Sequence, residues 1–151
     1  MGPRSSPGVG GSKATLYGYF KSKEELLLAC LYADITRQSE QLLDTMLRAG
    51  TLREGLIELG TAYMTRRLAR RPISNVRIMA TQPEELGIGK EFYATTLRPA
   101  WEIFADRVGR LMDAGILHRA DPWTVAMQWK GLLETDMFDR RLIGAIREGD
   151  P

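Results

Sequence analysis

Apolar residues recur every three or four positions along most of the chain after residue 11, which is the spacing of one face of an α-helix. Ser22 followed by Glu25, and Thr51 followed by Glu54, are capping-box patterns that predict helix starts. Asp121 and the proline after it predict a third such start. The spacing predicts helices over 12–19, 22–49, 52–71, 73–81, 90–114 and 123–138, the last of which could extend to 146.

Glycine and proline predict where these helices end or bend. We expect Pro72 to open the fourth helix and Pro83 to end it. Pro99 lies inside the fifth helix and should kink or interrupt it, and Gly115 should stop it. No segment alternates apolar and polar residues as a strand does, so the predicted fold class is all-α.

The composition narrows the possible functions. The 151 residues are enough for one domain, and a net charge of +2 means that any affinity for nucleic acid must come from a local basic patch. Cys30 is the lone cysteine and is expected in the core, whereas His118, the lone histidine, is expected to cap a helix or face solvent. No apolar run reaches the roughly 20 residues of a membrane span, and no signal peptide is evident. The expectation is a cytoplasmic protein that is not an enzyme and holds no metal or cofactor.

The segment Ser12–Leu28 carries the most information about function. Residues 1–23 contain four Lys or Arg and no acid, and a short helix capped by Ser12 would present small residues that fit the major groove. Hydroxyl groups on three of its residues could bind phosphate oxygens. The DNA-binding candidates are Ser12, Lys13, Ala14, Thr15, Tyr17, Gly18, Tyr19 and Lys23. From spacing alone, these aromatics could instead be core residues that join two helices.

This segment closely resembles the recognition helix and following turn of TetR-family transcriptional regulators. The matching residues are Ser12, Lys13, Thr15, Leu16, Tyr17, Tyr19, Phe20, Ser22, Lys23, Glu24 and Leu26. The resemblance implies a TetR-like helical bundle with an incomplete N-terminal helix-turn-helix. It also implies a repressor whose partners are double-stranded DNA, a small apolar effector and a second copy of the chain. Its domains would be a disordered leader over 1–11, a remnant of the DNA-binding domain with a connecting helix over 12–48, and a ligand-binding and dimerisation domain over 49–151.

The resemblance also leads us to expect that helices found at both ends of the family fold are missing or shortened here. In the family two helices precede the matched segment, but only eleven residues precede Ser12, so DNA affinity should be weak. The final helix, which usually completes the dimer interface, looks short. Three alternatives stay open: a ligand-binding or dimerisation module with little DNA binding of its own, a compact variant that dimerises with what it has, or a natural chain with a longer N-terminus.

Residues 51–138 more loosely resemble the ligand-binding domain of these regulators, in which helices enclose an apolar pocket. The pocket candidates are Tyr63, Arg67, Met79, Trp101, Phe104 and Trp129. The aromatic members could equally be core residues, and Arg67, Gln82 or Gln128 could supply the polar contact. Near the C-terminus, a set of mixed charges is expected to form a solvated face. These residues are Glu134, Asp136, Asp139, Arg140, Arg141 and Arg147.

Overall fold

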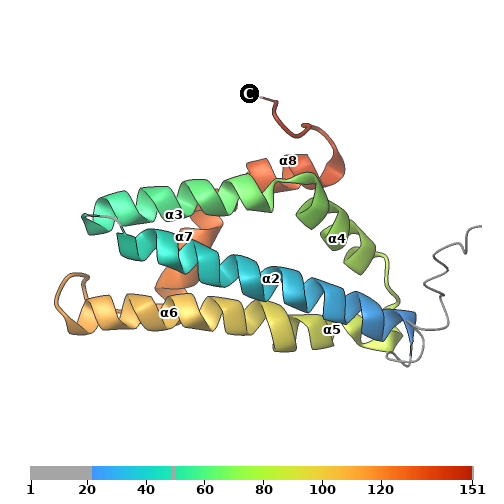
Figure 1. Cartoon of the computed structure of the whole chain (residues 1–151), viewed down its shortest axis with the longest axis horizontal. Helices are drawn as coiled ribbons and strands as arrows, with labels where there is room; N and C mark the ends of the chain where they lie inside the picture. Colours follow the sequence, from blue (N-terminus) through green and yellow to red (C-terminus); the bar gives the residue numbers. More distant parts are fainter. Residues whose placement is uncertain (1–21, 49, 151) are drawn as a thin grey trace, which may run out of the picture.

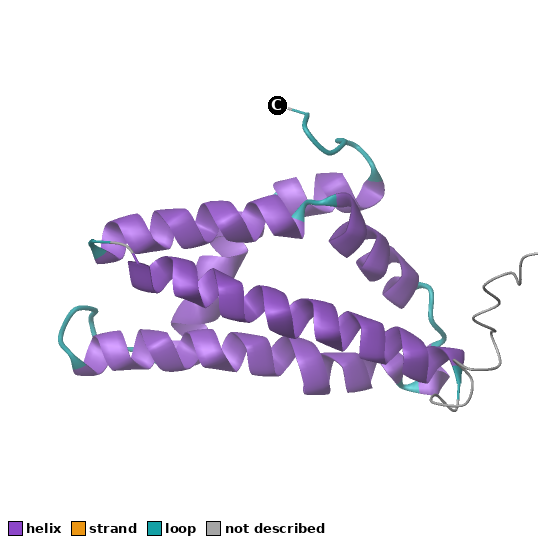
Figure 2. Cartoon of the chain, viewed as in Figure 1, coloured by secondary structure: helices purple, strands orange, loops and turns teal. Residues whose placement is uncertain are grey.

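The structure, a computed structural model, describes residues 22–48 and 50–150, and all regular elements within these ranges are helical (Figure 2). In chain order they are α2 (Lys23–Arg48), α3 (Leu52–Arg67), α4 (Arg70–Ala80), the 3₁₀ turn η1 (Glu84–Leu86), α5 (Ile88–Phe92), the π-helical turn η2 (Tyr93–Leu97), α6 (Arg98–Asp113), α7 (Pro122–Glu134) and α8 (Met137–Ile143). The all-α prediction is therefore confirmed. Among the described helices, none has the length and apolarity needed to cross a membrane.

Helix α2 lies between α3 and α6, and these three helices run nearly parallel in the view of Figure 1. Helices α2 and α3 form an antiparallel pair joined by a tight turn, while α4 leads away from the end of α3 towards α5. Helix α7 crosses behind this layer, packing on α6 and reaching α3, and α8 lies against α4 and α7. The chain thus forms a helical bundle in which α3, α6 and α7 surround the main core.

The core is formed by side chains that α3, α6 and α7 bury together. Its buried members are Leu59, Phe104, Ala105, Val108, Met112 and Ala126. Three tryptophans, Trp101, Trp123 and Trp129, pack against this cluster while staying partly exposed. The members from α6 recur at helical spacing, as predicted from the sequence, whereas Leu132 of α7, which was expected on the same face as Trp129, is exposed.

The predicted helix starts at Ser22, Thr51 and Asp121 are confirmed by hydrogen bonds of the capping side chains. The Ser22 hydroxyl accepts from the Glu25 backbone N–H at 3.1 Å. The Thr51 hydroxyl accepts from the Glu54 N–H at 3.2 Å and donates to the Glu54 carboxylate at 2.9 Å. The Asp121 carboxylate accepts from the Thr124 N–H at 2.7 Å. Each bond satisfies an N–H group that has no partner within its own helix.

The boundary between α3 and α4 differs from the prediction. Helix α3 ends at Arg67, and α4 begins at Arg70, so Pro72 is the third residue of α4 and does not open it. Ala69 is the N-cap residue, with an extended backbone at ψ 155°. A proline is tolerated at this third position because the first N–H groups of a helix have no intrahelical acceptor. The preference of proline for a helix start therefore identified the first turn of α4 but not its first residue.

The predicted helix over 90–114 is interrupted, as Pro99 suggested, and it starts earlier, at Ile88. The π-helical turn η2 ends at Leu97, two residues before Pro99, and the Arg98 N–H reaches back five residues to the Tyr93 carbonyl. A proline cannot donate to the preceding turn, and its ring crowds the carbonyl four residues earlier. The wider π turn accommodates both constraints without ending the run of helix.

The last predicted helix, over 123–138 or as far as 146, is wrong in its C-terminal part. Helix α7 ends at Glu134, and α8 is a separate helix. Between them Asp136 has a φ of 63°, and the Met137 N–H donates to the Thr135 carbonyl at 2.7 Å. This three-residue turn is a strained conformation for a residue with a side chain. No change in apolar spacing marks the corner.

Three side-chain placements also differ from expectation. Cys30 is exposed rather than in the core, while the next residue, Leu31, is buried. One step along a helix rotates the side chain by about 100°, so the two cannot share a face. Arg141 is only 8% exposed and Glu134 is mostly buried, so neither belongs to a solvated face. His118 is exposed, as expected.

Candidate functional site

An aromatic cluster lies where α3, α6 and α7 meet. Tyr63 from α3 contacts Trp101 from α6 edge-on, with ring centroids 5.5 Å apart. The Phe104 ring centroid lies 5.9 Å from that of Trp101 and 4.9 Å from that of Trp129 on α7, and the two tryptophan centroids are 6.5 Å apart. Four of the six predicted pocket residues are therefore neighbours. In the described structure these rings contact one another, as core side chains do.

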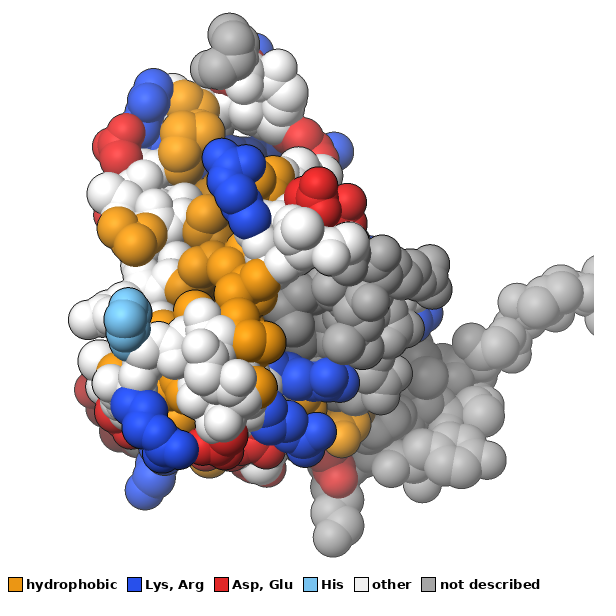
Figure 3. Space-filling view, turned by 90° about the vertical axis from the view of Figure 1, so that its left-hand side faces the viewer, with side chains coloured by type: hydrophobic (Ala, Val, Ile, Leu, Met, Phe, Trp, Pro, Cys, Tyr) orange, Lys and Arg blue, Asp and Glu red, His pale blue; other side chains and the backbone are white. Residues whose placement is uncertain are grey.

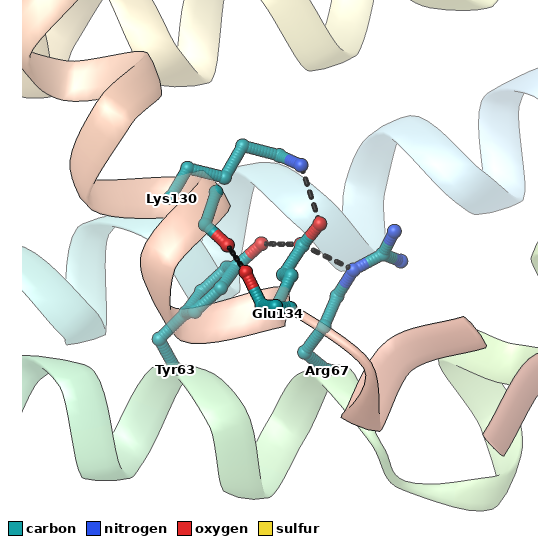
Figure 4. A network of polar contacts seen from close by, with 6 residues as sticks. Tyr63, Arg67, Lys130 and Glu134 are labelled. Atoms are coloured by element: carbon teal, nitrogen blue, oxygen red, sulfur yellow. Dashed lines mark hydrogen bonds and ion pairs between the residues drawn. The ribbon is translucent and has the colours of Figure 1, made fainter. Parts of the chain in front are cut away.

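A polar network centred on Glu134 adjoins this cluster (Figure 4). One carboxylate oxygen, Oε1, accepts from the Tyr63 hydroxyl and from Arg67 Nε, the latter at 2.9 Å. The other oxygen, Oε2, accepts from Lys130 Nζ at 2.5 Å. Tyr63 and Arg67 are four residues apart on α3, and Lys130 and Glu134 are four apart on α7, so each pair shares one helix face. The network therefore joins α3 to α7.

Burial and charge shape the proton equilibria of this network. Burial raises the pKa of the Tyr63 hydroxyl, and the hydrogen bond to the Glu134 carboxylate raises it further. Burial alone would raise the pKa of Glu134 as well. Hydrogen bonds from Lys130 and Tyr63 and the positive charges of Arg67 and Lys130 outweigh this effect, so the pKa of Glu134 is lowered. At neutral pH the network holds two cations and one anion.

The two cations also contact aromatic rings. The Arg67 guanidinium lies over the Phe138 ring, 3.8 Å from its centroid, which connects the network to α8. Lys130 Nζ lies 6.0 Å from the Trp101 ring centroid, at the edge of the aromatic cluster. The site therefore combines apolar surface with a surplus of positive charge.

The remaining pocket candidates lie apart from this site. Met79 is on α4 and is not part of the aromatic cluster or of the core around it. The Gln82 side chain donates to the Ile78 carbonyl at 3.0 Å, and Gln128 is exposed on α7. Of the three residues considered for the polar contact, Arg67 is the one beside the rings. Sequence reasoning missed Glu134 and Lys130, although their spacing of four residues was a usable signal.

An open groove of about 480 Å³ runs between α3 and α7, and Trp129 lines it as well as the aromatic cluster. Its other lining residues are Arg53, Leu56, Ile57, Gly60, Thr61 and Leu133. Figure 3 shows apolar side chains gathered in a band on the end of the molecule that carries the α2–α3 and α6–α7 turns. The groove gives solvent a route to one edge of the aromatic cluster.

Of the predicted DNA-binding residues, Lys23 alone lies within the described part of the chain. It is the first residue of α2, follows the capping residue Ser22 and is exposed. Its charge adds to the positive end of the helix dipole, and this combination suits a phosphate group. The other candidates, Ser12, Lys13, Ala14, Thr15, Tyr17, Gly18 and Tyr19, lie outside the described residues, as do the expected leader and first helix.

The lowered pKa of Glu134 predicts a specific loss of stability in acid. A carboxyl group whose folded pKa lies below its unfolded value, about 4.3 for Glu, stabilises the fold above that value. The contribution is lost as the pH falls through the folded pKa. We expect Glu134→Gln to be less stable than the parent near neutral pH, with the difference shrinking below about pH 4. Melting temperatures between pH 3 and 7 measure this, and Glu58→Gln, at an exposed position of α3, should leave the profile unchanged. A constant difference at every pH would contradict the prediction.

The fold and the site together define a class: an all-helical protein with a helical core domain that follows a basic N-terminal segment. Residues 54–151, more than half of the chain, match the family described as AefR-like transcriptional repressor, C-terminal domain. Residues 8–30 match the family described as bacterial regulatory proteins, tetR family. The chain therefore belongs to the TetR family of DNA-binding transcriptional regulators, which are typically not enzymes. Neither a curated protein nor a solved structure matches it.

Proposed function

We propose that this regulator is a repressor and that a small effector with an apolar body, bound in the helical domain, lowers its affinity for DNA. The main support is the cluster of Tyr63, Trp101, Phe104 and Trp129, which offers apolar surface beside a polar group. The match of residues 54–151 to an AefR-like repressor domain agrees with this role. Residues 12–48 would then form the DNA-binding part with its connecting helix, and residues 49–151 the effector and dimer part. We propose that it acts in the cytoplasm, where bacterial DNA is, and that it has no catalytic role.

Helix α2 offers a physical route between the two parts. It begins at Lys23, next to the segment proposed to bind DNA, and its 26 residues extend for about 39 Å. Along this length it packs against α3 and α6, the helices that carry Tyr63 and Trp101. An effector that binds one arrangement of α3 and α6 more tightly would shift α2 and the segment before it.

A gel shift with the intact protein tests DNA binding directly. Duplexes that cover the promoter regions flanking its own gene are compared with shuffled duplexes of equal length, at 50 and 200 mM salt. A regulator of this kind should shift the promoter DNA preferentially and lose affinity as the salt concentration rises. If micromolar protein gives no salt-sensitive shift that prefers the promoter sequence, the proposal that this chain binds DNA is contradicted.

A second function is supported by the extent of the family matches. The match to a C-terminal domain covers residues 54–151, whereas the match to the DNA-binding family covers only residues 8–30. The chain could thus work as a ligand-binding and dimerisation module that pairs with a full-length relative. Light scattering together with the same gel shift distinguishes the two functions, because a module of this kind forms dimers but shifts no DNA.

Lys23→Ala is expected to weaken DNA binding to all duplexes by a similar factor. Lys23 would contact a phosphate group, so its loss should reduce the slope of log affinity against log salt by about 1 without changing sequence preference. Arg119→Ala is the matched control because Arg119 is an exposed cation on the α6–α7 loop, at the opposite end of the molecule from the start of α2. Equal losses of DNA affinity in both variants would mean that Lys23 makes no specific contact with a phosphate group.

We also propose that the protein is a homodimer paired through α7 and α8. These helices expose two large apolar side chains, Leu132 and Ile143, each 79% accessible in the single chain. Apolar residues this exposed are common at interfaces between copies of a chain. We expect Leu132→Asp to shift the protein from dimer to monomer in sedimentation at micromolar concentration. Ile116→Asp, at an exposed apolar position on the α6–α7 loop, should remain dimeric. A dimer that survives Leu132→Asp would place the interface elsewhere.

A further inference from the structure

We infer that the effector carries an anionic group, such as a carboxylate, beside its apolar body, and that this group binds Arg67 and Lys130 in place of the Glu134 carboxylate. The inference deepens the proposed function and rests on it, because it names the chemical class of the effector. It is carried by the arrangement of two cations, one anion and four aromatic rings at the junction of α3, α6 and α7.

The charges at this junction are already arranged to bind a carboxylate. Arg67 Nε and Lys130 Nζ approach the two oxygens of Glu134 from different helices, at 2.9 and 2.5 Å. Bonds between charged donors and a carboxylate are stronger than neutral ones. Figure 4 shows the outer nitrogens of Arg67 turned away from Glu134. With two cations against one anion, the site has a net positive charge and favours a further negative group over a positive one.

The aromatic cluster adjoins these cations. The Tyr63 ring packs edge-on against Trp101, and the same Tyr63 hydroxyl donates to Glu134. Lys130 lies near the face of Trp101, and Trp129 lines both the cluster and the groove between α3 and α7. A ligand in the groove would contact Trp129, and the next residue on α7, Lys130, is one of the two cations. Such a site selects molecules that are apolar at one end and anionic at the other.

Replacement of Glu134 by a ligand anion would act on the corner between α7 and α8. Glu134 is the last residue of α7, where the negative end of the helix dipole disfavours a carboxylate. Two residues later Asp136 has a left-handed backbone at φ 63°, and Arg67 lies over Phe138 of α8. Releasing Glu134 frees the strained corner and changes the contact between α3 and α8. Because α8 belongs to the proposed dimer face, the ligand would alter how the two copies pair.

Three naphthalene probes of similar size test the ligand class on the intact protein. They are 2-naphthoate, the neutral 2-naphthylmethanol and the cationic 2-naphthylmethylammonium, each titrated while the tryptophan fluorescence is recorded. We expect the anion to bind at least tenfold more tightly than the alcohol and the cation to bind most weakly. Equal binding of the anion and the alcohol would overturn the inference while leaving an apolar effector in place.

Two variants separate ligand recognition from simple support of the fold. Lys130→Met removes one cation and should weaken naphthoate binding at least tenfold. Glu134→Gln removes the competing anion and should tighten naphthoate binding, although it loses an ion pair of the folded protein. A purely structural network predicts weaker binding in both variants, so weaker naphthoate binding in Glu134→Gln would overturn the inference. Arg119→Met is the control for a general loss of positive charge, and circular dichroism verifies that each variant is folded.

A gel shift in the presence of each probe tests the effect on DNA binding separately from ligand binding. Naphthoate added to the gel shift should release the bound duplex, and the alcohol should not. If the protein shifts its promoter DNA but binds none of the three probes, the anionic-ligand inference fails and DNA binding stands. If it binds naphthoate as expected but shifts no DNA, the repressor proposal fails and the ligand class stands.

Discussion

Phe104→Ala is expected to lower the free energy of unfolding by about 3–5 kcal/mol, which is typical for truncation of a buried aromatic residue. Phe104 is only 6% exposed and packs against both Trp101 and Trp129. Both tryptophans are held by other contacts of the core, so they cannot close fully over the space that the ring leaves. Urea denaturation followed by circular dichroism at 222 nm measures the change.

The preceding residue supplies the control for this prediction. Ile103 is on the same helix but is 49% exposed, so Ile103→Ala should cost about 1 kcal/mol or less. Both variants truncate a large apolar side chain of α6 to alanine. The main difference between them is whether that side chain points into the core or towards solvent. Similar losses in the two variants would show that Phe104 is not the centre of the core.

The helix starts could be predicted from the sequence because their cause is local. Ser22, Thr51 and Asp121 each bond to an N–H three residues away, so a window of four residues contains all the information needed. The break before Pro99 is local for the same reason. The corner at Asp136 was not predictable, because it depends on how α7 and α8 pack on α3 and α4 rather than on nearby residues.

The residues of the candidate site also divide into those that could be predicted from the sequence and those that could not. Spacing near 3.6 residues placed Trp101 and Phe104 on the inner face of one helix, and the structure confirms this packing. Arg67 was among the predicted pocket residues, but Glu134 and Lys130 were not identified, because a charged residue looks the same in sequence whether it is solvated or buried. Glu134 pairs with Arg67 across 67 residues of chain, and Arg141 bonds to Leu68 across 73. Pairings so distant arise only once the helices have packed.

Arg141 belongs to a pair of arginines that tie α8 to the end of α3 and to α4. Arg141 Nε donates to the Leu68 carbonyl at 2.9 Å, at the C-terminal end of α3. In return Arg77 of α4 donates to the Leu142 carbonyl at 2.9 Å and to the Arg141 carbonyl at 3.2 Å, at the C-terminal end of α8. Each cation lies at the negative end of another helix, where its charge stabilises the dipole. The two contacts hold α8 in place although it is only 7 residues long.

Arg141→Ala should therefore lower the free energy of unfolding by about 2–4 kcal/mol, since it removes a charged hydrogen bond, a helix-end cation and the packing of a side chain that is only 8% exposed. Arg140→Ala is the matched control. Arg140 is exposed and pairs loosely with Asp136 at 3.4 Å, and an exposed pair of this kind contributes about 0.5 kcal/mol. Arg141→Lys keeps the charge but not the position of Nε, so its loss should fall between the two. If Arg141→Ala is no more harmful than Arg140→Ala, α8 must be held by contacts other than this one, such as the hydrogen bonds that it accepts from Arg77.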